Sequence, residues 1–374
     1  MPDFPHEWSK LNVILCHDWL TGMRGGERVL EILCDAFPKA PIYTLIHNPV
    51  AISKKINDHE IRTSWLQNVP GIMTRYRYFL PLFPSAIEGM HLPNADLLIS
   101  TSHCVAKGLR TKPGTKHLCY CFTPMRYAWT FHNEYFGGNS VKSLIARAVL
   151  PSLRNWDKKS SRRVHRFLAL SRHVQKRIKD FYGRDSDVVY PPVDTSRWTL
   201  ANGARSGGFD LIVSALVPYK RVDLAVRAYS RLAYPLKIVG VGTELAALRR
   251  IASPNIEFLG RQTDDAILAL YRTCRLLIFP GEEDFGLVPV EAQACGAPIV
   301  AYRKGGVLES VEENVTGVFF DKQDEDSLLD AASRCATARL DATTIRANAE
   351  RFGIKNFIDG LEDSIVKCMK RERF

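Results

Sequence analysis

One stretch decides the fold: Arg275-Leu-Leu-Ile-Phe-Pro-Gly-Glu-Glu-Asp-Phe-Gly-Leu-Val-Pro-Val-Glu-Ala-Gln-Ala-Cys-Gly-Ala-Pro298. Residues 276–279 are apolar enough for a buried parallel strand. A helix is expected to begin near Leu287, because Pro289 then falls in the first turn, where proline is tolerated. A buried strand, a glycine-containing loop and a helix form the unit from which doubly wound α/β sheets are built.

The start of this helix predicts an anion site. The backbone N–H groups of Gly286, Leu287 and Val288 have no acceptor within the helix, and they lie at the positive end of its dipole. Gly286 carries no side chain, so a phosphate group can approach the backbone closely. We therefore expect phosphate oxygens to bind here.

Two carboxylates flank the predicted anion site. Glu283 lies in the loop before the helix together with Asp284 and Phe285, and Glu291 lies inside the helix. Because a carboxylate accepts hydrogen bonds from paired hydroxyl groups, we assign Glu291 to a ribose and Glu283 to a sugar ring. Asp284 and Phe285 complete the predicted donor site.

The spacing from Glu283 to Glu291 resembles the E-x7-E motif of retaining glycosyltransferase family 4. The segment Ser214-Ala-Leu-Val-Pro-Tyr-Lys-Arg221 resembles the phosphate-binding lysine segment of that family, and Gly25-Gly-Glu-Arg-Val-Leu30 resembles its N-terminal glycine loop. Together the three segments span nearly the whole chain. The segments 17–28, 121–129 and 214–221 resemble those of bacterial O-antigen and exopolysaccharide mannosyltransferases.

The resemblance implies the GT-B architecture, in which two Rossmann-like domains face each other across a cleft and the last helix crosses back to the first domain. The strands are expected at residues 11–16, 42–46, 95–100, 117–122, 166–170 and 187–190 in the first half, and at 211–216, 236–239, 256–259, 276–279 and 299–301 in the second. The prolines at 191–192 and the polar stretch 199–208 indicate a linker. We predict an acceptor-side domain over 1–198, a nucleotide-sugar-binding domain over 199–353 and a returning helix over 354–374.

The resemblance assigns the leaving diphosphate to Lys220, aided by Arg221. Many members of the family carry an arginine where Ala215 stands, so one phosphate contact is missing, and Arg221 or Arg126 is the expected replacement. A preorganised cation beside the developing negative charge is the largest single contribution that such a site can make to the rate. We therefore predict Lys220 and Glu283 as the catalytic pair.

The first domain is expected to contribute backbone and cleft residues. Gly25 and Gly26 open a helix after the first strand, where their N–H groups can meet the diphosphate, and Asp18 precedes them. Many relatives place a histidine that touches the donor sugar where this chain has Phe122. His103, which follows another expected strand, is the alternative histidine of the cleft. The basic groups make a metal ion unnecessary, so neither a metal nor another cofactor is expected.

Composition narrows the class of protein. The chain has 374 residues, of which 46% are hydrophobic, which is sufficient for two domains. Its nine cysteines are scattered, which argues against a disulfide scaffold or a zinc site. Neither a spanning helix nor a signal peptide is recognised, so a cytoplasmic location is expected.

The net charge of +11 lies entirely in residues 1–200 and is densest over 142–184, which favours a polyanionic partner. A basic face that only aids solubility is the alternative. No nucleic-acid-reading motif accompanies the charge, so we expect an anionic membrane or a lipid-pyrophosphate acceptor instead. Residues 69–83 mix aromatic side chains with arginines, which fits either an interfacial segment or packing against the first sheet.

The sequence thus predicts a metal-independent retaining glycosyltransferase that transfers a hexose to a glycan or lipid-linked acceptor in cell-surface polysaccharide or lipopolysaccharide synthesis. A peripheral contact with the inner face of the cell membrane is a further expectation. GDP-mannose is the favoured donor. A UDP-sugar donor and a nucleotide-sugar epimerase of the same fold stay open. The alternative from another class is a glycan- or nucleic-acid-binding scaffold that releases no nucleotide.

Overall fold

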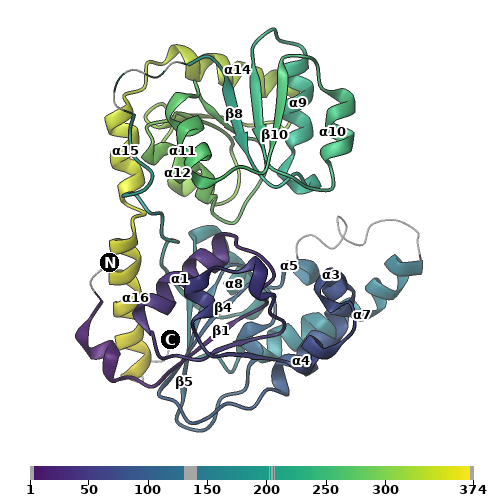
Figure 1. Ribbon diagram of the computed structural model, residues 1–374, viewed down its shortest axis with the longest axis vertical. Helices are drawn as coiled ribbons and strands as arrows, with labels where there is room; N and C mark the ends of the chain where they lie inside the picture. The colour runs from purple at the N-terminus through teal and green to yellow at the C-terminus, as the bar shows by residue number, and fades with distance from the viewer. Residues whose placement is uncertain (1–3, 130–140, 202, 204, 206, 371–374) are drawn as a thin grey trace. The chain divides into compact units, whose positions relative to one another are not determined.

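A computed structural model describes residues 4–129, 141–201, 203, 205 and 207–370 of the chain. For residues 141–148 it describes the backbone only. The chain divides into two compact units (Figure 1). Unit 1 comprises residues 1–190 and 358–374, and unit 2 comprises residues 191–357. The division after Tyr190 falls earlier than the predicted linker after residue 198. Residues 371–374 of the predicted returning helix lie outside the described residues.

The sheet of unit 1 is entirely parallel, in the order β3-β2-β1-β4-β5-β6-β7. Its strands are β1 Val13–His17, β2 Ile42–Thr44, β3 Ile61–Thr63, β4 Leu97–Ser102, β5 Lys116–Cys121, β6 Arg166–Ala169 and β7 Asp187–Val188. The order reverses at β1, whose neighbours are β2 and β4. The sequence pattern missed β3, because this edge strand has three residues and none of them is buried.

Helices cover both faces of this sheet. The α-helices of unit 1 are α1 Gly25–Ala36, α2 Lys54–Asn57, α3 Ile72–Arg75, α4 Phe83–Glu88, α5 Arg126–Trp129, α7 Val141–Ser161 and α8 Arg172–Tyr182. The 3-10 helices are η1 His6–Lys10, η2 Pro49–Ala51, η3 Trp65–Asn68, η4 Tyr76–Leu82 and η5 Ala106–Gly108.

The sheet of unit 2 is also parallel, in the order β10-β9-β8-β11-β12-β13. Its strands are β8 Asp210–Val213, β9 Leu236–Val239, β10 Ile256–Gly260, β11 Leu277–Phe279, β12 Ile299–Tyr302 and β13 Gly317–Phe320. Here the order reverses at β8, between β9 and β11. The sequence pattern missed β13 because the strand opens with a glycine. A Cβ atom on Gly317 would lie 2.2 Å from the Ile299 carbonyl oxygen, so this close pairing with β12 requires glycine.

The remaining helices are η6 Pro218–Lys220, α9 Val222–Ser230, α10 Leu245–Ile251, α11 Asp264–Thr273, α12 Leu287–Ala294, α13 Val307–Ser310, α14 Glu325–Thr337, α15 Ala342–Glu350 and α16 Ile354–Met369. Most of α16 belongs to unit 1, as predicted for the returning helix. Gly360 of α16 packs closely on Val189, where a Cβ atom would approach the valine side chain to 3.1 Å. The predicted pair of Rossmann-like domains is confirmed.

The segment 69–83 is divided between core and surface. Ile72, Tyr76, Leu80 and Phe83 are buried and join the hydrophobic core of unit 1. On the opposite side Tyr78 is 73% exposed and Leu82 is 42% exposed. One face of this segment therefore packs in the core of unit 1, and the other face is exposed as an interfacial segment would be. Among the described residues, no helix has the length and apolarity needed to span a bilayer.

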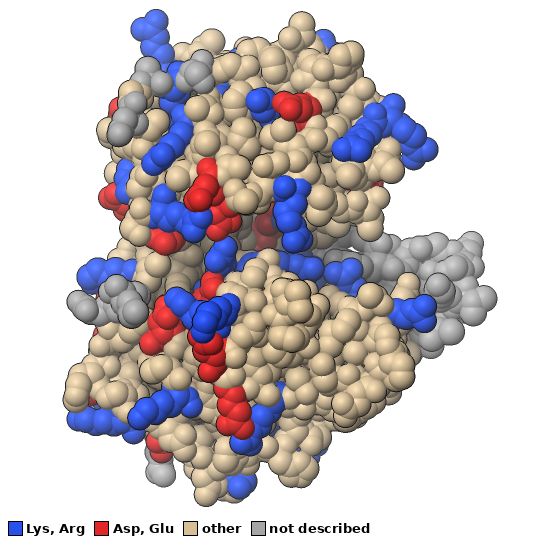
Figure 2. Space-filling model, in the orientation of Figure 1, with Lys and Arg blue, Asp and Glu red and all other residues tan. Residues whose placement is uncertain are grey.

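The basic excess of unit 1 is partly used inside the unit. Arg163 pairs with Glu88 and Arg166 with Asp187, while Arg184 donates to the carbonyl oxygens of Ser161 and Val164. On the face shown in Figure 2, acidic side chains lie among the basic ones, so no field of a single sign covers that face. The positive charge of that face is therefore lower than the net charge of the chain suggests.

Candidate functional site

The candidate donor site lies in unit 2, at the carboxyl ends of β8 and β11. These neighbouring strands flank the point where the strand order reverses, which is where doubly wound sheets bind ligands. The loop after β8 leads into η6 and ends at Lys220, and the loop after β11 carries Glu283. The topology therefore brings together two segments that lie about sixty residues apart in the sequence.

Lys220 and Glu283 form an ion pair between Nζ and Oε1. The lysine side chain is 15% exposed and the carboxylate side chain 21% exposed, so both charges are largely removed from water yet still accessible. A part-buried ion pair holds its groups more firmly than an exposed one, because solvent screens it less. The two predicted catalytic residues are thus adjacent.

The lysine loop packs directly on the loop after β11. A Cβ atom on Gly281 would lie 2.9 Å from both the Cα atom and the carbonyl oxygen of Lys220. Arg221 follows in a left-handed conformation (φ 52°), which is uncommon for a residue other than glycine. Its guanidinium donates to Gln323 Oε1 at 3.0 Å, and Gln323 donates to the Pro280 carbonyl oxygen at 3.0 Å. Arg221 therefore links the two loops.

A pair of glycines after β12 supports the Glu283 loop from the other side. The Gly306 N–H group donates to the Glu283 carbonyl oxygen at 2.8 Å. A Cβ atom on Gly306 would lie 2.2 Å from the Asp284 carbonyl oxygen, and one on Gly305 would lie 2.4 Å from that of Glu283. The sequence interpretation did not include these glycines. Their signal was the Gly-Gly pair after an apolar strand, the same pattern that identified Gly25 and Gly26.

Helix α12 begins at Leu287, as predicted, and Gly286 precedes it with φ 91°. Glycine has no side chain to cap the helix, so the first-turn N–H groups are offered to solvent or ligand. A Cβ atom on Gly286 would also approach the Phe279 ring to 3.0 Å. Asp284 and Phe285 are buried, so their side chains shape the loop rather than line its surface.

Glu291 is held by a residue that the sequence did not reveal. The hydroxyl group of Tyr271, on α11, donates to Glu291 Oε2 at 3.1 Å. Tyr271 is fully buried, and burial raises its pKa well above the ordinary value, with the neighbouring carboxylate adding to the effect. The phenol therefore stays protonated and acts as a fixed donor to this carboxylate.

In unit 1, α1 begins at Gly25 as predicted, and Glu27 accepts a hydrogen bond from the Arg24 N–H group at 3.0 Å. A Cβ atom on Gly26 would lie 3.1 Å from the Phe122 ring and 3.4 Å from the His17 ring. Phe122, in place of the histidine of many relatives, thus packs beside the glycine loop.

Asp18 requires a correction. We expected it to line a cleft, but it is fully buried and accepts hydrogen bonds from the N–H groups of residues 103–106. Burial alone would raise the pKa of this carboxyl group. His103 and the N–H donors outweigh burial, and the pKa lies well below its usual value. Asp18 therefore fixes a loop instead of lining a surface.

Arg126 opens α5 in unit 1, at the end of the loop that follows β5. Among the described residues, no three His, Cys, Asp or Glu side chains gather where they could hold a metal ion. All nine cysteines are free and buried.

The protein-family model described as "Glycosyl transferases group 1" matches residues 208–352, which include Lys220, Glu283 and Glu291. Residues 208–352, which make up less than half of the chain, are similar to this family. The matched region coincides with most of unit 2. The matched curated relatives include a D-inositol 3-phosphate glycosyltransferase of Acidothermus cellulolyticus, which is 31% identical over 221 residues, or 50% of this chain and 49% of the relative. The chain spans about half the length of the curated relatives it matches.

Solved structures resemble nearly the whole chain. Sucrose-phosphate synthase from Thermosynechococcus elongatus has a TM-score of 0.74 at 16% identity, over 96% of this chain and 100% of that one. Anabaena HepE in complex with UDP and glucose has a TM-score of 0.70 at 18% identity, over 95% and 99%. At such identities the likeness shows the fold alone. The fold of the chain is GT-B, and the region that matches the group 1 model carries the candidate donor site.

Proposed function

We propose that the chain is a retaining glycosyltransferase that transfers a hexose from a nucleoside diphosphate sugar. The observation that carries the proposal is the pairing of Lys220 with Glu283 beside the start of α12, at the reversal point of the second sheet. A cation, a hydroxyl-binding carboxylate and helix amides without a side-chain cap are the groups that a sugar diphosphate needs.

Each group has a role in this proposal. The diphosphate binds Lys220 and the first-turn N–H groups of α12, while Glu291, steadied by Tyr271, accepts hydrogen bonds from the ribose. Glu283 exchanges its contact with Lys220 for the hydroxyl groups of the transferred sugar. As the bond to the diphosphate breaks, the ammonium group of Lys220 meets the growing negative charge. We propose that these groups suffice without a metal ion or another cofactor.

The favoured donor is GDP-mannose, on the resemblance of the glycine, lysine and 121–129 segments to mannosyltransferases of bacterial surface polysaccharides. A UDP-sugar is the second candidate, because the structural neighbour HepE holds UDP and glucose. Epimerisation of a nucleotide sugar on the same site would release no diphosphate. A scaffold that only binds glycans or nucleic acid would not bind a nucleotide sugar at all.

We propose a glycan or lipid-pyrophosphate-linked saccharide as the acceptor, reached at the inner face of the cell membrane by a cytoplasmic enzyme. The exposed side of 69–83 supports this proposal, since Tyr78 and Leu82 are exposed and so are Arg75 and Arg77 of the same segment. Aromatic, aliphatic and basic side chains on one surface suit the boundary of an anionic bilayer.

A thermal-shift screen tests the proposal. GDP, UDP and ADP, with GDP-mannose and UDP-glucose, would each be added at saturating concentration, and a ligand at one hundred times its dissociation constant adds about 2.7 kcal/mol to the free energy of unfolding. We expect one base to stabilise the protein, and Glu291→Ala to reduce that shift. Glu257→Ala, at a 59% exposed carboxylate of the same unit, is the control. If no nucleotide stabilises the wild-type chain, the proposal is wrong.

A further inference from the structure

Gln323 joins the two loops that carry the candidate catalytic pair. It lies in the turn between β13 and α14 and is partly buried. Its Oε1 atom accepts a hydrogen bond from the Arg221 guanidinium at 3.0 Å, and its Nε2 atom donates to the Pro280 carbonyl oxygen at 3.0 Å. Arg221 directly follows Lys220, and Pro280 opens the loop that carries Glu283. One side chain therefore spans both loops.

This bridge requires a side chain that both donates and accepts hydrogen bonds. The guanidinium group of Arg221 only donates, and the carbonyl oxygen of Pro280 only accepts. A glutamine amide meets both needs at once. Glutamate has no donor at neutral pH, and methionine, which has a similar length, has only a weak acceptor. The two partners also assign the orientation of the Gln323 amide, because only its oxygen can face a guanidinium group.

The backbone of Arg221 indicates that its side chain is needed at this position. Its φ of 52° is left-handed, a conformation that glycine adopts without penalty and arginine does not. Such a residue persists where the contacts around it hold it in place. Arg221 Nε donates to Asp223 Oδ1 at 3.2 Å, while another guanidinium nitrogen donates to Gln323. These contacts favour a bridging role for Arg221 over the direct phosphate contact expected from the sequence.

The turn that carries Gln323 is held at both ends within unit 2. Asp321, at its start, pairs with Arg303 at 2.6 Å, and Glu325, at its end, pairs with Arg227 of α9 at 3.1 Å. Helices α9 and α14 also contribute to one buried core. Exposed ion pairs are individually weak, so the core packing holds the turn and the pairs only orient it. The backbone of Gln323 is therefore fixed.

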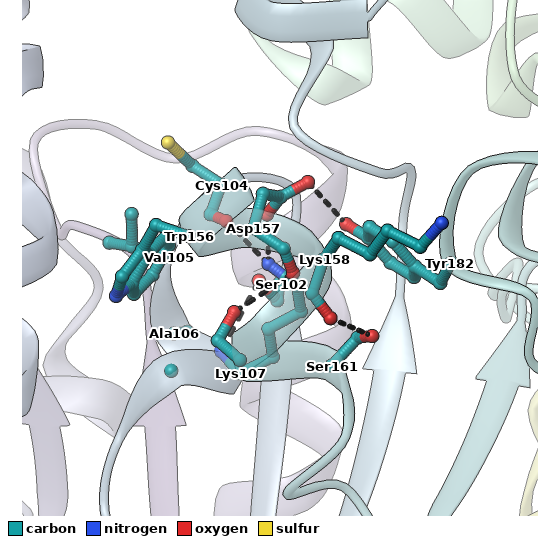
Figure 3. Close-up of polar contacts among 12 residues, drawn as sticks. Ser102, Cys104, Val105, Ala106, Lys107, Trp156, Asp157, Lys158, Ser161 and Tyr182 are labelled. Carbon is teal, nitrogen blue, oxygen red and sulfur yellow. Dashed lines mark hydrogen bonds and ion pairs between the residues drawn. The ribbon is translucent and has the colours of Figure 1, made fainter. Parts of the chain in front are cut away.

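A polar side chain joins distant segments in a similar way in unit 1 (Figure 3). There Asp157 of α7 pairs with Lys107 of η5 and accepts a hydrogen bond from the Tyr182 hydroxyl group at 2.8 Å. Lys107 in turn donates to the Cys104 carbonyl oxygen at 3.2 Å. Both members of this ion pair are almost completely buried, so the pair fixes the fold of unit 1. Gln323 differs, because the two loops that it joins carry a partly exposed ion pair.

We propose that Gln323 is a positioning residue that sets the distance between Lys220 and Glu283. Its effect on the reaction rests on the proposed glycosyl transfer, whereas its effect on the loops does not. Without Gln323, the lysine loop still packs on Gly281, but the Arg221 side chain loses the partner that ties it to the other loop. A displacement of about 1 Å at a reacting group lowers a rate about a hundredfold. Gln323 acts through the two loops and does not itself touch the donor.

The first experiment needs no ligand. The full-length wild type and Gln323→Met are treated with limiting acetic anhydride, and acetylation of Lys220 is followed by mass spectrometry. Lys54, whose side chain is 86% exposed, is the internal standard. In the wild type, Lys220 is 15% exposed and paired with Glu283, so it should react slowly. In Gln323→Met it should react several-fold faster, because the loops separate. Equal rates at Lys220 in the two proteins would overturn the proposal.

The second experiment measures release of nucleoside diphosphate from GDP-mannose and from UDP-glucose. Gln323→Met should lower kcat for the donor that the wild type cleaves about ten- to a hundredfold. GDP or UDP should bind with nearly wild-type affinity, because Glu291 lies outside the bridge. If Gln323→Met fails to fold, Gln323→Glu takes its place, since it keeps the acceptor for Arg221 and loses only the donor for Pro280. Wild-type kcat in the variant would contradict the proposal.

A double-mutant cycle separates a bridge from a direct phosphate contact. Arg221→Met removes the guanidinium group and leaves a side chain in the same left-handed backbone. If Arg221 and Gln323 act as one bridge, the double variant should be about as slow as the slower single variant. Additive losses in kcat, or weaker binding of GDP or UDP by Arg221→Met alone, would overturn the proposal.

Two controls test for general destabilisation. Gln175→Met is the matched control, because Gln175 is also partly buried and donates to a carbonyl oxygen, that of Ser186 at 2.6 Å, in unit 1. Tyr182→Phe removes a hydrogen bond from the cluster in Figure 3 and should lower the thermal midpoint. Both variants should keep wild-type kcat and wild-type acetylation of Lys220.

The two experiments distinguish failure of this inference from failure of the proposed function. Faster acetylation of Lys220 in Gln323→Met, with no cleavage of either donor by the wild type, would support the bridge and reject the proposed function. Donor cleavage by the wild type, with unchanged acetylation and kcat in Gln323→Met, would reject this inference alone.

Discussion

Replacing Gly306 by alanine should damage catalysis without preventing folding. Gly306 has φ −69°, which alanine adopts freely, so the backbone conformation itself adds no strain. The cost comes from the methyl group, which would lie 2.2 Å from the Asp284 carbonyl oxygen and 2.4 Å from the Phe285 Cα atom. Ordinary contact begins near 3.4 Å, and the difference from 2.2 Å means that the loop carrying Glu283 must move by about 1 Å.

A displacement of about 1 Å at a reacting group can lower the rate about a hundredfold, whereas overpacking of this kind costs about 1–3 kcal/mol of stability. We therefore expect Gly306→Ala to fold but to lose about two orders of magnitude in kcat/KM for release of nucleoside diphosphate from the donor. The thermal midpoint is measured in parallel, so that assays are run on folded protein.

Gly208→Ala is the control, because a Cβ atom there meets nothing within 4 Å and the change is the same addition of one methyl group in the same unit. It should keep wild-type activity. If Gly306→Ala retains wild-type kcat/KM, the loop does not position Glu283 for the reaction, and the support assigned to the glycine pair is wrong.

Three further outcomes are expected. Glu291→Ala should weaken nucleotide binding by about 1.5–3 kcal/mol, the value of a hydrogen bond to a charged group. Tyr271→Phe removes the hydrogen bond to Glu291 and should have a smaller effect in the same direction. Equal affinity of the wild type and Glu291→Ala in calorimetry would reject the ribose assignment. Burial, and then the neighbouring positive groups, lower the pKa of His117 to about 3 in the folded protein. The unfolded-state pKa is about 6.5, so the contribution of this histidine to stability is fully present above pH 6.5. The free energy of unfolding should therefore fall as the pH drops from 6.5 toward 3. At pH 5 this loss is about 2 kcal/mol, and His117→Gln should remove it from the urea-unfolding profile; an unchanged profile would show that His117 does not titrate on unfolding. Finally, the exposed side of 69–83 should bind anionic vesicles, and added salt should weaken this binding. The double variant Tyr78→Ser, Leu82→Ser should bind these vesicles more weakly than the wild type. Equal partitioning of the wild type onto neutral and anionic vesicles at low salt would contradict the membrane proposal.

The fold was predictable because its signals are local. Apolar runs followed by glycine-containing loops marked most strands, and Gly286 with Pro289 located the start of α12 correctly. Where the local signal is weak the prediction failed, as at the short, half-exposed β3 and at β13, which opens with the glycine that close pairing requires.

The site was predictable only where a segment carries its own pattern. Lys220 and Glu283 belong to recognisable loops, and the parallel topology brings them together. The hydrogen bond from Tyr271 to Glu291 joins two helices through side chains, and no spacing in the sequence marks it. Asp18 was misassigned for a related reason: its position after β1 suggests a cleft residue, but burial and four N–H donors from a loop some eighty-five residues away decide its role.

The most direct test of the central claim is cleavage of the nucleotide sugar by the wild type and by Lys220→Ala, followed as release of nucleoside diphosphate in the presence of EDTA. We expect the wild type to release nucleotide without added metal. Loss of one preorganised cation at a developing negative charge should lower kcat of the variant about a hundred- to a thousandfold, or about 2.7–4 kcal/mol. Wild-type turnover by Lys220→Ala at saturating donor, or recovery of its activity by a divalent metal, would contradict the account.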